Sequence, residues 1–381
     1  MKEKKKNSLY KYLQKDIKDF NKYILSLVCI GILVGAGLLS YYVTSSYALF
    51  SDTIMGTKTI EGTVDVRSTI SLKFVNGSIA EDESTSKTIN KGGSTTFKIS
   101  PTLGYGNPTV SCTTEVDSSA TDELLTLKNV KDDTECTVTY NILTWSNSSD
   151  KQLKTVLTAA TEGKLDLSSW KVGEERKITI NAFSGKFTSS IPAQTATLVI
   201  MNIGGKTRTD GKTCNFVVGF KEAIINQEYY NSSNASNDYK NSDLDNTMTK
   251  IYNALPADTQ ALFQDWNVLV GKPNTKGVDS GILTGTQTLS RKLAAPAYKE
   301  VLGESKSYHT DEDNALTQLE YFKTSANRIK YYKGTATIWR LRSPAYWDTE
   351  GDCDSYCIKT TGVKGVYAVS DGRSVSPIGC V

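Results

Sequence analysis

Four carboxylates occupy every second position of an acidic segment near the C-terminus, W-D-T-E-G-D-C-D. They belong to Asp348, Glu350, Asp352 and Asp354. Oxygen ligands alternating around a glycine are typical of calcium loops. The bidentate carboxylate that closes such a loop is absent, because Ile358 and Lys359 follow. The segment therefore predicts either a calcium site or an acidic surface loop.

Aromatic and basic side chains flank this segment. Trp347 and Tyr356 lie beside the carboxylates, where a ring can stack on a sugar. The run Trp339-Arg340-Leu341-Arg342-Ser343-Pro344 predicts a strand that Pro344 ends, with its arginines on the face opposite Trp339 and Leu341. One interpretation is a packed core in which the arginines stack or pair with a buried carboxylate. The other is ligand contact through Trp339, Arg340, Arg342, Trp347 and Tyr356.

The residue types leave little room for catalysis. His309 is the only histidine, and it lies in a polar run, which excludes sites that need several histidines. Two acidic pairs, Asp311 with Asp313 and Asp352 with Asp354, have the residue types of a glycoside hydrolase. Both pairs occur in polar segments, where solvated carboxylates are expected. We therefore predict that the chain is not an enzyme and has no catalytic residue, with cell-wall glycan hydrolysis as an alternative.

Seven cysteines indicate a disulfide framework. Cys29 lies in an apolar run, and the other six follow it. Cys112 with Cys136 is the preferred pair, because both fall in predicted strands of one module. Cys353 and Cys357 are close enough in sequence to close a small loop, which leaves Cys214 and Cys380 paired with each other or both free. The absence of a C-x-x-C pair and of nearby histidines disfavours zinc. We therefore predict no cofactor, with calcium at the acidic segment as the alternative.

A membrane anchor is predicted near the N-terminus. Residues 23–47 read YILSLVCIGILVGAGLLSYYVTSSY, and Ile24 to Val43 are long enough to span a hydrocarbon core. Residues 1–22 hold eight lysines and three acidic residues, so the positive-inside rule places this tail in the cytoplasm and residues 52–381 outside. The following SSYALFSDT resembles the end of signal segments on bacterial matrix-fibre and surface proteins, which makes cleavage near Ala48 the alternative.

The remaining chain reads as β modules followed by a mixed domain. Short alternating strands bounded by Gly, Asn, Asp and Ser predict an all-β module over 48–140 and a second over 141–219. Residues 220–381 predict an α+β domain. A helix through Leu244 to Leu255 has apolar residues at helical spacing, with Ser242 or Asp243 as its cap. Shorter helices are expected at 258–265 and 294–302.

The first module resembles the small Ig-like modules of Gram-positive surface proteins. These carry P-x-x-G-Y, a cysteine, and later N-V-x-x-D-T-x-C-x-V. The chain has these features from Pro101 to Val138, including Cys112 and Cys136. The resemblance implies a spacer.

The C-terminal domain resembles a bacterial surface-protein family of unknown function with the signature W-W-L-R-S-P, then a D-G turn, then G-V-R-P-A. The matching residues run from Trp339 to Pro344 and through Gly372, with an L-L-S-x-x-E-like element at Leu293 to Glu300. Arg340 stands where the family has its second tryptophan. The chain stops at Val381 before R-P-A, so an edge strand is expected to be missing or the chain truncated. The resemblance implies a C-type-lectin-like fold, which more often binds glycans or proteins than catalyses.

Together these features predict a membrane-anchored surface protein that displays a recognition domain on β-rich spacers. The alternative is a self-assembling matrix or pilus-like subunit. Basic and acidic residues nearly balance, at 44 and 41, which gives no indication of nucleic-acid binding. The expected partners are the membrane, through residues 23–47, and an extracellular glycan or protein.

Overall fold

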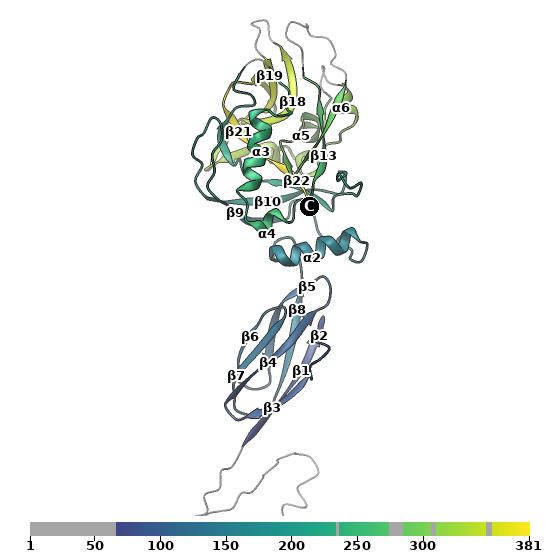
Figure 1. Ribbon diagram of the computed structural model, residues 1–381, viewed down its shortest axis with the longest axis vertical. Coiled ribbons are helices and arrows are strands. Elements are labelled where there is room, and N and C mark those ends of the chain that lie inside the picture. Colours follow the sequence, from purple (N-terminus) through teal and green to yellow (C-terminus); the bar gives the residue numbers. More distant parts are fainter. Residues whose placement is uncertain (1–65, 234–235, 274–284, 306–309, 348–352) are drawn as a thin grey trace, which may run out of the picture.

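The computed structural model describes residues 66–233, 236–273, 285–305, 310–347 and 353–381. The predicted cytoplasmic tail, the apolar segment 23–47 and the cleavage position at Ala48 lie outside these residues. Within the described ranges, no helix is both long and apolar enough to cross a membrane. The described chain is mostly β-sheet, since strands make up 44% and helices 15% of it. It forms a sandwich at one end and a larger mixed body at the other (Figure 1).

The sandwich consists of two four-stranded sheets around one core. Their strand orders are β3-β1-β8-β5 and β2-β4-β7-β6. Alternation along the strands builds the core, since Ile70 and Leu72 face inward from β1 and Phe97 and Ile99 from β4. The strands are β1 (Arg67–Val75), β2 (Gly77–Ile79), β3 (Ser86–Asn90), β4 (Gly93–Pro101), β5 (Tyr105–Cys112), β6 (Asp117–Ala120), β7 (Leu124–Val130) and β8 (Thr134–Ile142).

The predicted bond between Cys112 and Cys136 is present in this sandwich. The two residues are direct partners on β5 and β8, with their Cα atoms 4.0 Å apart. The disulfide therefore joins neighbouring strands of one sheet and does not bridge the two sheets.

The predicted second module, 141–219, does not form a separate unit. Its strands join the C-terminal segments in the sheet β15-β22-β11-β10-β9, and one hydrophobic core runs from Leu143 to Val381. The reason is that β11 is buried at every position and pairs with both β10 and β22, which belongs to the chain's last residues. The strands are β9 (Glu175–Ile180), β10 (Gln194–Ile203), β11 (Phe216–Phe220), β15 (Leu293–Ala294) and β22 (Ile378–Cys380).

A second five-stranded sheet completes the C-terminal body. Its order is β12-β21-β18-β19-β20, and β18 lies at its centre. The strands are β12 (Ile225–Glu228), β18 (Trp339–Trp347), β19 (Cys353–Ile358), β20 (Lys364–Ala368) and β21 (Arg373–Val375). Two hairpins pair β13 (Trp266–Gly271) with β14 (Thr286–Arg291) and β16 (Lys330–Tyr332) with β17 (Thr335–Thr337).

Helices cover the edges of these sheets. The predicted helix from Leu244 is α3 (Asp243–Asn253), and the Ser242 hydroxyl caps it by accepting the Asp245 N–H at 3.1 Å. The shorter predicted helices are α4 (Ala257–Gln260) and α5 (Tyr298–Leu302), which ends at Gly303 with φ 75°. The others in the described C-terminal body are α6 (Thr310–Asn314) and the 3-10 turns η1 (Glu320–Lys323) and η2 (Ser325–Arg328).

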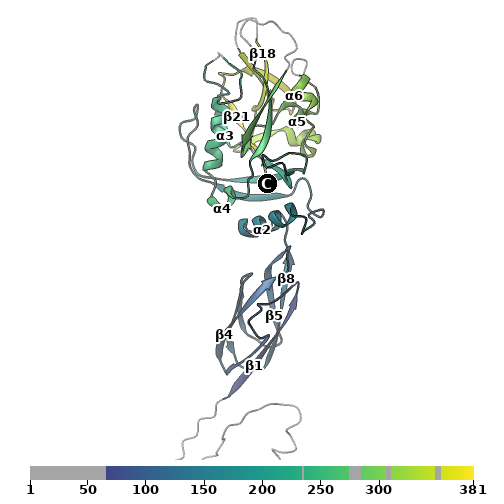
Figure 2. The same cartoon turned by 45° about the vertical axis from the view of Figure 1, so that its right-hand side comes forward.

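A helix that the sequence reading missed, α2 (Asp150–Thr161), lies between the sandwich and the C-terminal body in both views (Figures 1 and 2). Its N-terminus is a capping box, in which Ser149 and Gln152 each accept the other's backbone N–H. The Gln152 side-chain nitrogen also donates to Asp122 at 2.6 Å and to Asn107 at 3.1 Å, both in the sandwich. One side chain therefore caps the helix and attaches it to the sandwich.

The same helical turn is attached to the C-terminal body. Asp150 forms an ion pair with Arg176 of β9 and accepts a hydrogen bond from the Thr259 hydroxyl at 2.5 Å. Both partners of the ion pair are largely buried, at 11% and 15% exposure, so the pair is shielded from solvent. Consequently α2 acts as a brace between the two parts of the molecule.

We predict that Gln152→Ala loosens this brace. Losing the amide removes two bonds to the sandwich and one half of the capping box, whereas both cores are untouched. Distances between spin labels introduced as non-canonical amino acids at Lys128 and Lys250 should spread more widely in the variant. Lys154→Ala is the matched control, since that side chain is exposed on the same helix. Equal distance distributions for Gln152→Ala and wild type would contradict the brace.

Candidate functional site

The signature strand β18 is buried from Trp339 to Ala345. Trp339, Arg340, Leu341 and Arg342 each have 0% exposure. The expected alternation gave the arginines one face of the strand, but both faces of this central strand are covered. The three predicted ligand residues Trp339, Arg340 and Arg342 therefore lie beneath the surface, where their side chains contact other parts of the protein.

Arg342 belongs to a buried charge network. Its guanidinium donates to Glu300 Oε2 at 2.6 Å, and Lys206 pairs with the other oxygen of the same carboxylate. Arg342 also donates to the carbonyls of Leu269 and Ala295, at 2.9 and 2.8 Å. The sequence expectation of an arginine paired with a buried carboxylate describes this contact, and Glu300 ends the predicted L-L-S-x-x-E-like element.

Glu300 depends on these two cations to remain ionised. Burial alone would raise its pKa, but the charges of Arg342 and Lys206 outweigh burial and hold the pKa well below its ordinary value. Its Oε2 also accepts the Ala297 N–H at 2.7 Å, which caps the short helix α5. The network thus joins α5, β18 and the loop that carries Lys206.

The next signature residue, Ser343, connects β18 to two helices. Its hydroxyl accepts the Tyr298 N–H at 2.9 Å and donates to the buried Glu312 of α6 at 3.0 Å. On the same strand, the Arg342 carbonyl accepts the Tyr230 hydroxyl at 2.8 Å. The L-R-S part of the signature is therefore an anchor for the elements around β18.

Arg340 has a different set of partners. Its guanidinium donates to the Ser355 hydroxyl at 2.6 Å and to the carbonyls of Tyr367, Ala368 and Asp371, at 3.2, 2.5 and 2.7 Å. These carbonyls belong to the end of β20 and the D-G turn that follows. Arg340 therefore holds that turn through its backbone carbonyls.

The remaining predicted site residues are the aromatic residues Trp347 and Tyr356 and the four carboxylates between Asp348 and Asp354. Tyr356 is buried, and its ring centre lies 4.6 Å from that of Tyr298. Trp347 ends β18, and Asp348, Glu350 and Asp352 fall outside the described residues. Asp354 is on β19, buried to 7% exposure, with its carbonyl accepting the Asn237 side chain at 3.1 Å. Among the described side chains, no group of three or more His, Cys, Asp or Glu could hold a metal ion.

Asp311 and Asp313 are not arranged as a catalytic pair. Asp311 is exposed whereas Asp313 is buried, because residues two apart on a helix point to different sides. Asp354 is buried, and both Asp352 and His309 lie outside the described residues.

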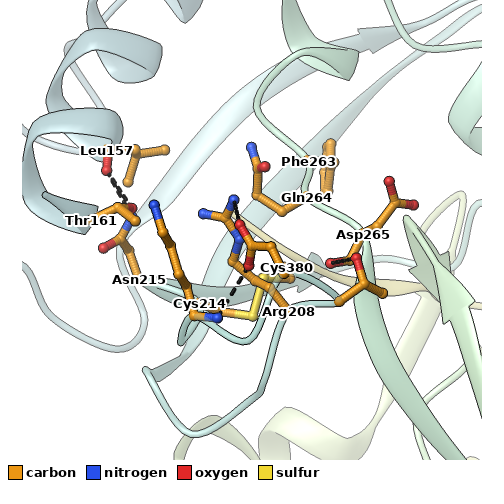
Figure 3. Close-up of polar contacts among 12 residues, drawn as sticks. Leu157, Thr161, Arg208, Cys214, Asn215, Phe263, Gln264, Asp265 and Cys380 are labelled. Carbon is orange, nitrogen blue, oxygen red and sulfur yellow. Dashed lines mark hydrogen bonds and ion pairs between the residues drawn. A yellow bond between two sulfur atoms is a disulfide. The ribbon is translucent and has the colours of Figure 1, made fainter.

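The predicted small loop between Cys353 and Cys357 is wrong. Both are buried thiols on the single strand β19. Four residues of extended strand separate Cα atoms by roughly 13 Å, about twice the distance that a disulfide spans. Cys214 instead pairs with Cys380, which fastens β22 to the loop before β11 (Figure 3).

The surroundings of this disulfide also fasten the C-terminal end of α2. Asn215 donates to the Leu157 carbonyl at 3.0 Å and to the Thr161 hydroxyl at 2.9 Å (Figure 3). A small cavity of about 140 Å³ beside it is lined by Lys154, Arg208 and Lys212, among others. A larger groove, of about 780 Å³, lies between the sandwich and α2. Neither contains a predicted ligand-binding or metal residue.

Sequence reasoning missed a buried lysine. Lys330 of β16 has 0% exposure and donates to the carbonyls of Phe220 and Lys221, at 2.6 and 3.1 Å. Its ammonium lies 5.4 to 5.9 Å from the ring centres of Phe322, Trp339 and Tyr321. Burial lowers the pKa of Lys330 to about 7, although Glu222 acts in the opposite direction. A lysine in the strand Lys330–Tyr332 gives no sequence signal of this burial.

We predict that Arg342→Met lowers the free energy of unfolding by about 3–5 kcal/mol, because it removes one of the two cations that compensate the buried Glu300 charge. The triple variant Arg342→Met, Glu300→Leu, Lys206→Met should recover most of this loss, since no buried charge then remains uncompensated. Chemical denaturation measures both. Lys323→Ala, at an exposed ion pair, is the control and should change stability by less than about 1 kcal/mol. A similarly small effect of Arg342→Met would contradict the assigned role.

We further predict that Lys330 makes stability increase with pH above neutrality. The folded state loses this proton near pH 7, whereas an unfolded lysine keeps it until about pH 10.4. Between these values the unfolded state binds more protons, so raising the pH favours folding. Denaturation at pH 6.5 to 10 should show a steeper rise for wild type than for Lys330→Met. Parallel curves would show that Lys330 does not titrate in this window.

A family model described as "Domain of unknown function (DUF6273)" matches residues 217–378. No curated protein and no solved structure matches the chain. Lys206 and Cys214, which complete the charge network and the disulfide, precede the matched region. A DUF6273 domain, uncharacterised as the sequence resemblance led us to expect, therefore covers residues 217–378 of this chain.

Proposed function

We propose that this chain is a membrane-anchored bacterial surface protein whose C-terminal domain recognises an extracellular ligand, with the sandwich and α2 as a braced spacer. The observation that carries the proposal is the order of the parts. The sandwich follows the apolar segment in the sequence, and the C-terminal body lies at the opposite end of the sandwich, beyond α2 (Figure 1). A domain held away from an anchor in this way is accessible to partners outside the cell.

The disulfides support an extracellular position for the described residues. Both parts of the molecule contain one, between Cys112 and Cys136 and between Cys214 and Cys380. Such bonds persist mainly in oxidising compartments. This agrees with the orientation that the lysine-rich tail predicts, with the N-terminus inside.

The buried signature supports recognition more than catalysis. Its arginines are occupied by backbone carbonyls, a hydroxyl and one carboxylate, so they support neighbouring loops. The two sheets of the sandwich suit the Ig-like spacer that the resemblance implies. The C-type-lectin-like fold and a calcium site at Asp348 to Asp354 remain predictions.

The test uses the full-length chain displayed on a Gram-positive host. Intact cells should lose the C-terminal body on treatment with extracellular protease and should bind a subset of an array of glycans, cell-wall polymers and host proteins. A chain with Ile32→Lys and Leu33→Lys is the control, and it should no longer be retained at the surface. Repeating the array in chelator tests the calcium site.

Two results would contradict the proposal. Protection of the C-terminal body from protease on intact cells would contradict the topology. Cells that display the folded chain yet bind nothing on the array would contradict recognition, and association between cells that scales with display level would favour the self-assembling subunit instead.

A further inference from the structure

An exposed aromatic ring lies on the loop between β9 and β10. The Phe187 side chain is 39% exposed, and its ring centre lies 4.8 Å from that of the half-buried Tyr229, edge to face. The Phe187 ring also lies against Gly372, where an added Cβ atom would be 2.8 Å from the ring. Any side chain at Gly372 would therefore displace Phe187, which explains the glycine of the D-G turn.

A buried carboxylate holds this loop. Glu228 of β12 is fully buried and accepts the N–H groups of Lys186, Phe187 and Tyr229, at 2.7, 2.8 and 3.0 Å. The Thr247 hydroxyl also donates a hydrogen bond to this carboxylate, at 3.3 Å. Two of these three N–H groups belong to the residues whose rings are in contact. The backbone that carries the exposed ring is thus held before any ligand arrives, which reduces the entropy lost on binding.

The neighbouring turn is held in the same manner. The Arg340 guanidinium donates to the carbonyls of Tyr367, Ala368 and Asp371. The Arg373 guanidinium lies 4.2 Å from the centre of the Tyr367 ring and donates to the Asp371 carboxylate at 2.8 Å. Arg373 and Asp371 keep 25% and 43% side-chain exposure, so both can reach a ligand.

We propose that these five residues, Phe187, Tyr229, Tyr367, Asp371 and Arg373, form a carbohydrate-binding surface, which we call the aromatic platform. The inference rests on the proposed recognition function and assigns its site and ligand class. Aromatic rings pack against the C–H faces of a sugar ring. The partly exposed arginine and aspartate offer donors and acceptors for adjacent hydroxyls. An apolar protein face would desolvate this charged pair without replacing its hydrogen bonds, whereas a sugar replaces them.

The Phe187 loop lies outside the segment 217–378 that matches the family model. Tyr229, Tyr367, Asp371 and Arg373 lie inside it. The platform is therefore completed by a part of this chain that the matched domain does not contain, and its ligand would depend on both.

The experiment uses the full-length chain in detergent micelles. A printed array of bacterial cell-wall polysaccharides and host-type glycans identifies a bound glycan, which is then titrated by calorimetry. We expect Phe187→Ala and Arg373→Ala each to raise the Kd for this glycan by about tenfold or more. Phe187→Tyr, which keeps the ring, should stay within about twofold.

Ile203→Ala is the matched control, because Ile203 is a 52% exposed hydrophobic residue at the other end of β10, roughly 30 Å of strand from Gln194. It should leave the Kd unchanged, and all variants should melt at the wild-type temperature. Glycan binding that survives both Phe187→Ala and Arg373→Ala would overturn the platform while leaving recognition intact. Binding of a protein ligand but of no glycan would overturn the carbohydrate class, and binding of nothing would overturn the proposed function as well.

Discussion

The carboxylate of Glu300, buried between Arg342 and Lys206, is the interaction on which the C-terminal body depends most. A buried charge without a partner would be unfavourable by several kcal/mol, so the folded state requires all three side chains in contact. They come from α5, β18 and the loop before β11, which are far apart in the sequence. Since Arg342 also binds the carbonyls of Leu269 and Ala295, the same network sets the positions of β13 and β15.

Other buried charges in the C-terminal body follow a related rule, in which one ionic side chain satisfies several backbone groups. Arg340 binds three carbonyls of one turn, Glu228 binds three N–H groups of two loops, and Lys330 binds two carbonyls beneath three aromatic rings. Loops usually leave their backbone groups to water, and they are correspondingly mobile. Here buried side chains supply the partners, so these loop backbones have hydrogen bonds to the interior.

How much the sequence could predict depended on the range of the interaction. The helix α3 was predictable because Ser242 and the apolar spacing are local, and the Cys112–Cys136 bond because both residues lie in strands of one module. The capping box of α2 was also local, but Ser149 and Gln152 stand in a segment that was interpreted as β-structure. The false second module had a different cause, since β11 takes its partner β22 from about 160 residues away.

The candidate site shows the same division. A core role for the W-R-L-R-S-P run, with a carboxylate partner for an arginine, was one of two interpretations, and ligand contact was the other. That Glu300 is this partner, and that Arg340 supports the D-G turn, depend on tertiary contacts. Phe187 and Glu228 gave no signal at all, because a phenylalanine and a glutamate in polar surroundings are unremarkable until the fold brings them together.

Hydrogen exchange of the full-length chain shows whether buried charges hold the surface loops in a fixed arrangement. The amide protons of Lys186, Phe187 and Tyr229 all donate to Glu228. A fixed arrangement predicts that these protons exchange as slowly as those of the strands β10 and β11, and that Glu228→Gln accelerates their exchange selectively. Exchange at the rate of an unprotected loop in the wild-type protein would contradict it.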